Sequence, residues 1–134
     1  MKIEVGTLSN LLRLKDSAIT KMMLGLRGKD MMKLVTWQET CEKETSPYDK
    51  VCDTLVKKYS EKGKTGIQPG DPNWVIFEVE IKSINKVVSV PAFPFTQKRV
   101  VEMIEKEKLD ISGFAFKDLI KFMWIPYKEK EEDK

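Results

Sequence analysis

Apolar and charged residues alternate almost without error from Trp74 to Lys82, and this run constrains the fold more than any other part of the chain. A β-strand places successive side chains on opposite faces of a sheet, so the alternation predicts a half-buried strand. The apolar face would carry Val75, Phe77, Val79 and Ile81, and the charged face Glu78, Glu80 and Lys82. The charged face is either an ordinary wet sheet surface or the acidic part of a metal-dependent active site.

The residues after this run predict that the strand is paired. Asn85 and Lys86 can turn the chain, and the valines that follow favour a returning strand, which gives an antiparallel hairpin near residues 74–90. Residues 1–5 and 111–116 are the candidates for an additional strand. For 111–116 the alternative is a helix capped near Ser112 and Gly113, and we expect a helix from about Phe116 to Trp124.

Helical periodicity covers most of the remaining chain. Apolar residues from Leu8 to Leu26 recur at spacings of three and four, which predicts an amphipathic helix of about five turns. A shorter helix is expected between Met31 and Glu42, another from Pro47 to about Lys62, and a fourth after the capping residue Thr96. The sequence therefore predicts a single α+β domain over residues 1–127, with a small antiparallel sheet packed against amphipathic helices. The charged segment 128–134 is expected to fray into solvent.

The composition excludes several classes of enzyme. The chain has 134 residues, no histidine and two cysteines, so Ser-His and Cys-His catalysis and the usual four-ligand zinc site within one chain are ruled out. Neither a Walker A sequence nor a GxGxxG motif occurs. No apolar run is long enough for a membrane span, so we expect a cytoplasmic protein that does not bind membranes and whose cysteines are thiols.

One motif points to metal-dependent chemistry. Glu80-Ile81-Lys82 resembles the acid-x-lysine element of PD-(D/E)xK nucleases, and the helix that starts near Gln97 resembles the one that follows this strand in Holliday-junction resolvases. The resemblance implies a magnesium-dependent nuclease in which Asp71, Glu80 and Lys82 are catalytic. Asp71, Glu78 and Glu80 would then bind the metal. The chain departs from the pattern because Asp71 precedes a proline and only eight residues separate it from Glu80.

The excess positive charge lies at the N-terminus. The net charge of the chain is +3, whereas residues 1–34 carry seven basic and three acidic residues, a local net charge of +4. Such a region suits an acidic partner, including nucleic acid bound without sequence specificity. The residues that would make these contacts are Lys15, Lys21, Arg27, Lys29 and Lys33.

Elimination favours a binding protein over an enzyme. Common catalytic motifs are missing, while amphipathic helices, methionine pairs and aromatic residues are plentiful. We therefore expect a non-catalytic intracellular binding or assembly module without a cofactor, which acts through contacts with another protein or with copies of itself. Its size and lysine-rich composition would suit an accessory protein of a phage or mobile element. The magnesium-dependent nuclease and the non-specific nucleic-acid binder are the alternatives.

Overall fold

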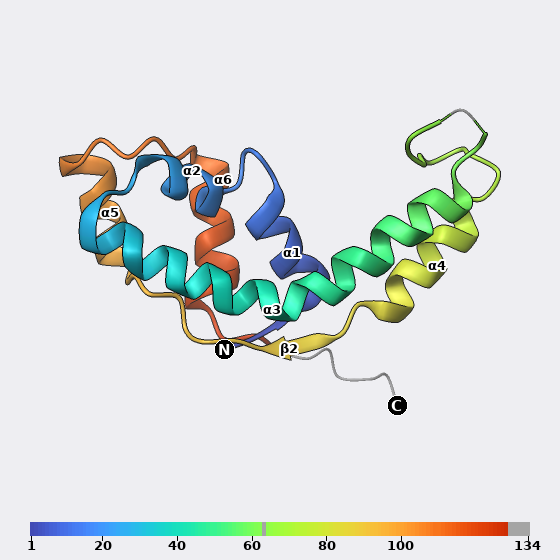
Figure 1. Ribbon diagram of the computed structural model, residues 1–134. Helices are drawn as coiled ribbons and strands as arrows, with labels where there is room; N and C mark the ends of the chain where they lie inside the picture. The colour runs from blue at the N-terminus through green and yellow to red at the C-terminus, as the bar shows by residue number, and fades with distance from the viewer. Residues whose placement is uncertain (63, 129–134) are drawn as a thin grey trace.

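The computed structural model of the protein describes residues 1–62 and 64–128, and its secondary structure is mostly helical. A short strand and two helices begin the chain, and a long helix follows. The C-terminal part holds three more α-helices, a second short strand and a π-helical turn (Figure 1). The elements are β1 (Lys2–Glu4), α1 (Val5–Arg13), α2 (Ala18–Gly25), α3 (Gly28–Tyr59), α4 (Trp74–Ile84), β2 (Val87–Ser89), α5 (Gln97–Lys106), α6 (Gly113–Leu119) and η1 (Ile120–Trp124).

The expected α+β fold is confirmed, but the strands of its sheet are not all where the sequence placed them. β1 and β2 form a two-stranded antiparallel sheet in which Ile3 lies opposite Val88. Thus the returning strand near residues 87–90 and the strand within 1–5 are correct predictions. The hairpin near 74–90 is wrong, because the partner of β2 is β1 and residues 74–84 form a helix.

The sequence of α4 also has helical periodicity, in addition to the alternation that predicted a strand. Its half-buried apolar residues also recur at spacings of three and four, and Glu78 forms an ion pair of 2.8 Å with Lys82 one helical turn away. The half-buried apolar residues of this helix are Trp74, Phe77, Ile81 and Ile84. A run that fits both periods can fold either way, and here packing against α3 favours the helix.

Residues 111–116 do not add a strand either. The Ser112 hydroxyl accepts a hydrogen bond from the backbone N–H of Ala115 and caps α6. The helix expected from about Phe116 therefore begins three residues earlier, and it continues as η1 to Trp124.

Two helix boundaries also differ from the prediction. The helix expected from Leu8 to Leu26 is divided, because Ser17 caps α2 by accepting from the N–H of Thr20 and donates to the carbonyl of Leu11. Conversely, α3 is continuous through Pro47, where a new helix was expected to start. Proline removes one backbone hydrogen bond from a helix interior, and α3 changes direction near its middle (Figure 1).

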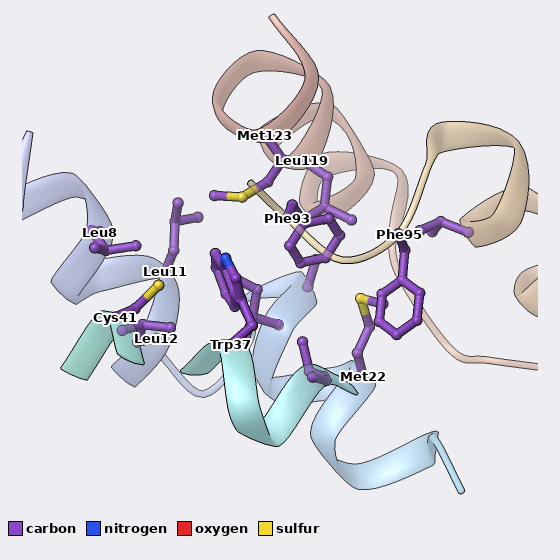
Figure 2. Packing of buried hydrophobic residues seen from close by; sticks show 14 of the residues in the cluster. Leu8, Leu11, Leu12, Met22, Trp37, Cys41, Phe93, Phe95, Leu119 and Met123 are labelled. Atoms are coloured by element: carbon purple, nitrogen blue, oxygen red, sulfur yellow. The ribbon is translucent and has the colours of Figure 1, made fainter. Parts of the chain in front are cut away.

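The main hydrophobic core lies between α1, α2, the first half of α3, and the α6–η1 segment (Figure 2). Trp37 packs edge-on against Phe93 with ring centroids 5.1 Å apart, and its indole N–H donates to the Pro91 carbonyl at 2.9 Å. The indole N–H of Trp124 donates to the Phe95 carbonyl at 2.9 Å. These contacts fix the irregular segment between β2 and α5 within the core.

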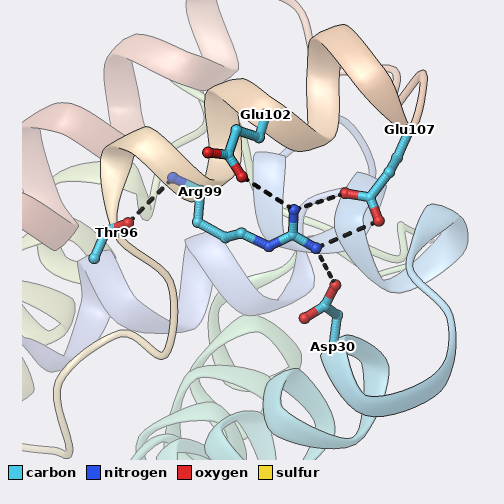
Figure 3. Close-up of polar contacts among 5 residues, drawn as sticks. All are labelled: Asp30, Thr96, Arg99, Glu102 and Glu107. Atoms are coloured by element: carbon cyan, nitrogen blue, oxygen red, sulfur yellow. Dashed lines mark hydrogen bonds and ion pairs between the residues drawn. The ribbon is translucent and has the colours of Figure 1, made fainter.

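Arg99 fastens α5 to the beginning of α3 (Figure 3). Its guanidinium lies 2.6 Å from the Asp30 carboxylate, 2.9 Å from Glu107 and 3.6 Å from Glu102. Thr96 caps the same helix by accepting from the N–H of Arg99, as the sequence predicted. Because the Arg99 guanidinium pairs with carboxylates of both α3 and α5, it fixes the orientation of the two helices relative to each other.

The prediction of one domain over residues 1–127 stays a prediction. Residues 129–134, most of the tail expected to fray, lie outside the described residues. Among the residues that are described, no helix is both long and apolar enough to cross a membrane.

Candidate functional site

The second half of α3 and the helix α4 project together from the rest of the molecule (Figure 1). We call residues 47–84 the arm and the remaining described residues the body. Within the arm, α4 runs back along α3, and residues 60–73 connect the two helices. The arm buries fewer apolar side chains than the body does.

A few contacts hold α4 against α3. The Tyr59 hydroxyl donates to Glu80 Oε1 at 2.6 Å, and Asn73 Nδ2 donates to the Tyr59 carbonyl at 3.2 Å. Leu55 is buried at 8% exposure but is not part of the main core cluster. The arm therefore has a small apolar contact of its own between its two helices.

The outward side of α4 is apolar at its distal end. Successive helical residues are about 100° apart, so the exposed residues of α4 fall on a single arc of about 120°. These residues are Val75, Ile76, Val79, Lys82 and Ser83. Val75 is 70% exposed, Ile76 52% and Val79 62%. We call these three residues the arm patch.

The arm patch is unusual for a helix of this composition. A helix with apolar residues on all sides is ordinarily buried in a protein core. In α4 the side toward α3 is only half-buried, the opposite side carries the arm patch, and none of its residues is buried. Contiguous exposed apolar surface of this kind marks sites of protein association.

Several contacts hold the proximal end of the arm, around residues 48 and 85, against the body. We call this end the root of the arm. The Asn85 side chain accepts from the backbone N–H of Gly6 at 2.9 Å and donates to Glu4 at 3.2 Å, while Val5 N–H donates to the Lys86 carbonyl at 2.7 Å. A Cβ at Gly6 would lie 2.9 Å from the Tyr48 hydroxyl and 3.0 Å from Asn85 Oδ1. Only glycine allows this close approach, so the arm leaves the body in a defined direction.

The opposite side of the root adds an ionic contact. Arg13 Nη1 lies 3.0 Å from Asp49 Oδ1, and the Ser9 hydroxyl donates to the same carboxylate oxygen. These contacts join α1 to the first arm turn of α3. Both helices of the arm are thus anchored at their proximal ends.

The residues of the nuclease hypothesis have local partners in the arm. Asp71 accepts from the backbone N–H of Gln68 at 2.9 Å and lies 3.8 Å from Lys64, while Glu80 accepts from Tyr59. Lys82 pairs with Glu78 and lowers the pKa of that carboxyl through the hydrogen bond between them.

The structure does not provide the strands on which the nuclease resemblance depends. Glu78, Glu80 and Lys82 lie on α4, and Asp71 lies in the loop before it. Across the described part of the chain, no group of three or more His, Cys, Asp or Glu side chains is placed to hold a metal ion. The nuclease stays a hypothesis without that structural basis.

The basic residues of the nucleic-acid hypothesis belong to the body. Lys15 lies in the turn before α2, Lys21 on α2, Arg27 just before α3, and Lys29 and Lys33 at the start of α3. All but the half-buried Lys21 are exposed. The hypothesis stays a prediction, for which steep weakening of binding with salt is the test.

Neither cysteine has the surroundings of a reactive thiol. Both are free thiols, and burial raises the pKa of Cys41 from 9.0 to about 12. Burial also raises the pKa of the half-buried Cys52, which contacts Tyr48. A thiol with a raised pKa holds little thiolate near neutral pH, so both are weak nucleophiles there.

Comparison with known proteins places the chain in no characterised group. No family model matches it, and searches of curated proteins and of solved structures give no significant match. The function therefore has to be argued from the molecule itself.

The arm patch was missed at the sequence level because its residues were assigned to a strand. The strand interpretation placed Val75 and Val79 on the buried face, whereas the helix exposes both. The signal that could have found it was the absence of a polar face: a helical projection of residues 74–84 has apolar residues on opposite sides.

Proposed function

We propose that this protein is a non-catalytic assembly module that associates through its arm, and that the partner is a second copy of the same chain. The observation that supports the proposal is the exposed arm patch on a helix with no buried residue. Burial of apolar surface is the main favourable contribution to protein association. A two-helix arm with one uncovered apolar side is half of a four-helix arrangement, which a two-fold axis would complete.

The spacing of the arm patch suits such a two-fold contact. In an antiparallel pair of α4 helices centred at residue 77, residues whose numbers add up to 154 lie opposite each other. Val75 of one copy then meets Val79 of the other, and both Ile76 side chains lie close to the axis. In this register the exposed apolar side chains of the two copies pack against one another.

The described chain offers no cover of its own for this surface. The arm patch points away from α3, and residues 129–134 consist only of glutamate, aspartate and lysine. The described residues therefore supply no apolar cover for the arm patch. A second copy is the partner that is always present at the same concentration as the protein.

The proposal is tested by measuring the mass of the purified protein over a wide concentration range by sedimentation equilibrium. The wild type is expected to change from monomer to dimer as concentration rises. Val79→Glu places a charge in the arm patch and is expected to hold the protein monomeric at every concentration. Leu24→Glu is the matched control, because Leu24 is 79% exposed on α2, away from the arm, and this variant should dimerise like the wild type.

A wild type that is monomeric throughout the range would overturn the proposal. So would a Val79→Glu variant that dimerises as strongly as the wild type.

A further inference from the structure

A second surface on the body has the features of a binding groove. A cavity of about 740 Å³ lies between the turn that joins α1 to α2 and the helix α6. Most binding pockets for small molecules and side chains have volumes of roughly 300 to 1,000 Å³. The groove belongs to the body and is separate from the arm patch.

The groove combines an apolar floor with an apolar rim. Leu11 and Ala115, both buried in the core, form part of its lining. Leu14 from the α1–α2 turn and Phe114 from α6 also line it, at 57% and 82% exposure. An exposed phenylalanine beside an apolar groove gives a partner side chain a large surface to bury against.

The charged residues of the groove favour a cation. Asp16 lines it from the turn and Asp118 from α6, and Lys15 also contributes, so its formal charge is −1. Both aspartates are exposed, and within residues 1–62 and 64–128 neither forms an ion pair. The Ser17 and Ser112 hydroxyls are occupied as helix caps. Asp16 and Asp118 are therefore the negatively charged acceptors that the groove offers a ligand.

From this combination we infer that the groove binds a peptide segment of another protein in which an apolar side chain lies next to lysine or arginine. The apolar side chain packs against Leu14 and Phe114, and the basic side chain meets Asp16 and Asp118. This preference is local, because the chain as a whole carries a net charge of +3 and repels cations at long range.

The inference is tested with two labelled pentapeptides of matched hydrophobicity, Phe-Arg-Leu-Arg-Phe and Phe-Glu-Leu-Glu-Phe, by fluorescence anisotropy at low salt. The basic peptide is expected to bind about tenfold more tightly, since two partly exposed ion pairs together correspond to roughly one decade in affinity. The double variant Asp16→Asn/Asp118→Asn should remove this preference. Phe114→Ala should weaken the binding of both peptides.

Two controls make the result specific. Asp53→Asn removes an exposed carboxylate of the arm and should leave the preference intact. Val79→Glu should bind the peptides like the wild type, so that failure of arm association and failure of groove binding give different results. Equal affinity for the two peptides would overturn the inference. Basic-peptide binding that survives both the double aspartate variant and Phe114→Ala would overturn it as well.

Discussion

The body and the arm carry similar apolar residues but bury them to different extents. In the body, Leu8, Ile19, Met22, Leu34, Met103 and Leu119 are all 0% exposed. In the arm, Leu55 is the buried apolar residue, at 8%, and α4 contributes none. The body therefore contributes most of the buried apolar surface, whereas the apolar side chains of the arm patch are exposed.

The largest predicted difference between the two regions is in the cost of removing an apolar side chain. Leu119→Ala in the body should lower the free energy of unfolding by about 2 to 5 kcal/mol, because it leaves a cavity in a closed core. At a concentration where the protein is monomeric, Val79→Ala in the arm should change it by no more than about 0.5 kcal/mol. Urea denaturation of both variants measures the difference, and equal losses would contradict the distinction between body and arm.

The junction between the two regions should be sensitive to one added methyl group. Gly6→Ala is expected to destabilise the protein by about 1 to 3 kcal/mol, since the new Cβ meets the Tyr48 hydroxyl and the Asn85 side-chain amide. Gly66→Ala is the matched control in the loop of the arm, where no atom lies within 4 Å of the added Cβ. Comparable urea midpoints for the two variants would show that the root is not closely packed.

Deprotonation of the cysteine thiols should lower the free energy of unfolding at alkaline pH, and most of this loss should come from Cys41 in the body. Burial raises the pKa of Cys41 to about 12, so the unfolded chain loses this proton first as pH rises above 9.0, and the folded state is disfavoured. The stability from the neutral thiol is fully present below pH 9 and is lost as pH rises toward 12. The loss should reach about 1 kcal/mol by pH 10.

This prediction is checked by urea denaturation at a series of pH values. Cys41→Ala should flatten the decline between pH 9 and 10, while Cys52→Ala in the arm should flatten it less, because Cys52 is only half-buried. A decline that is the same in Cys41→Ala and in the wild type would assign it to other groups.

The smallest predicted effect concerns the exposed ion pair of α4. Lys82→Gln removes the partner of Glu78, but both side chains face water and their attraction is screened. The urea midpoint of the monomer should not change measurably. A clear decrease would mean that the outward side of α4 contributes to folding, contrary to the division proposed here.

The sequence predicted well where a local signal had no competitor. Thr96 was identified as the cap of α5, and the valines near 87–90 as a strand, because each signal indicated only one structure. Pro47 failed as a start signal because the helix before it was already anchored in the core through Leu34, Trp37 and Cys41. Keeping Pro47 inside the helix, with the loss of one backbone hydrogen bond, then costs less free energy than ending the helix there.

The two candidate surfaces were missed for different reasons. In residues 74–84, β-branched residues and alternation favour a strand, and only the packing of α3 beside the segment decides for a helix. The groove brings Asp16 together with Asp118, about a hundred residues apart in the chain. No local pattern encodes such a pair.

Hydrogen–deuterium exchange of α4 at low and at high protein concentration tests the central claim most directly. In dilute solution the α4 amides should exchange faster than those in the first half of α3, since few contacts hold the arm together. At high concentration the α4 amides should become protected, while those of α1, α2 and α6 stay unchanged. Identical exchange of α4 at both concentrations would contradict the claim that the exposed face of the arm is an association surface.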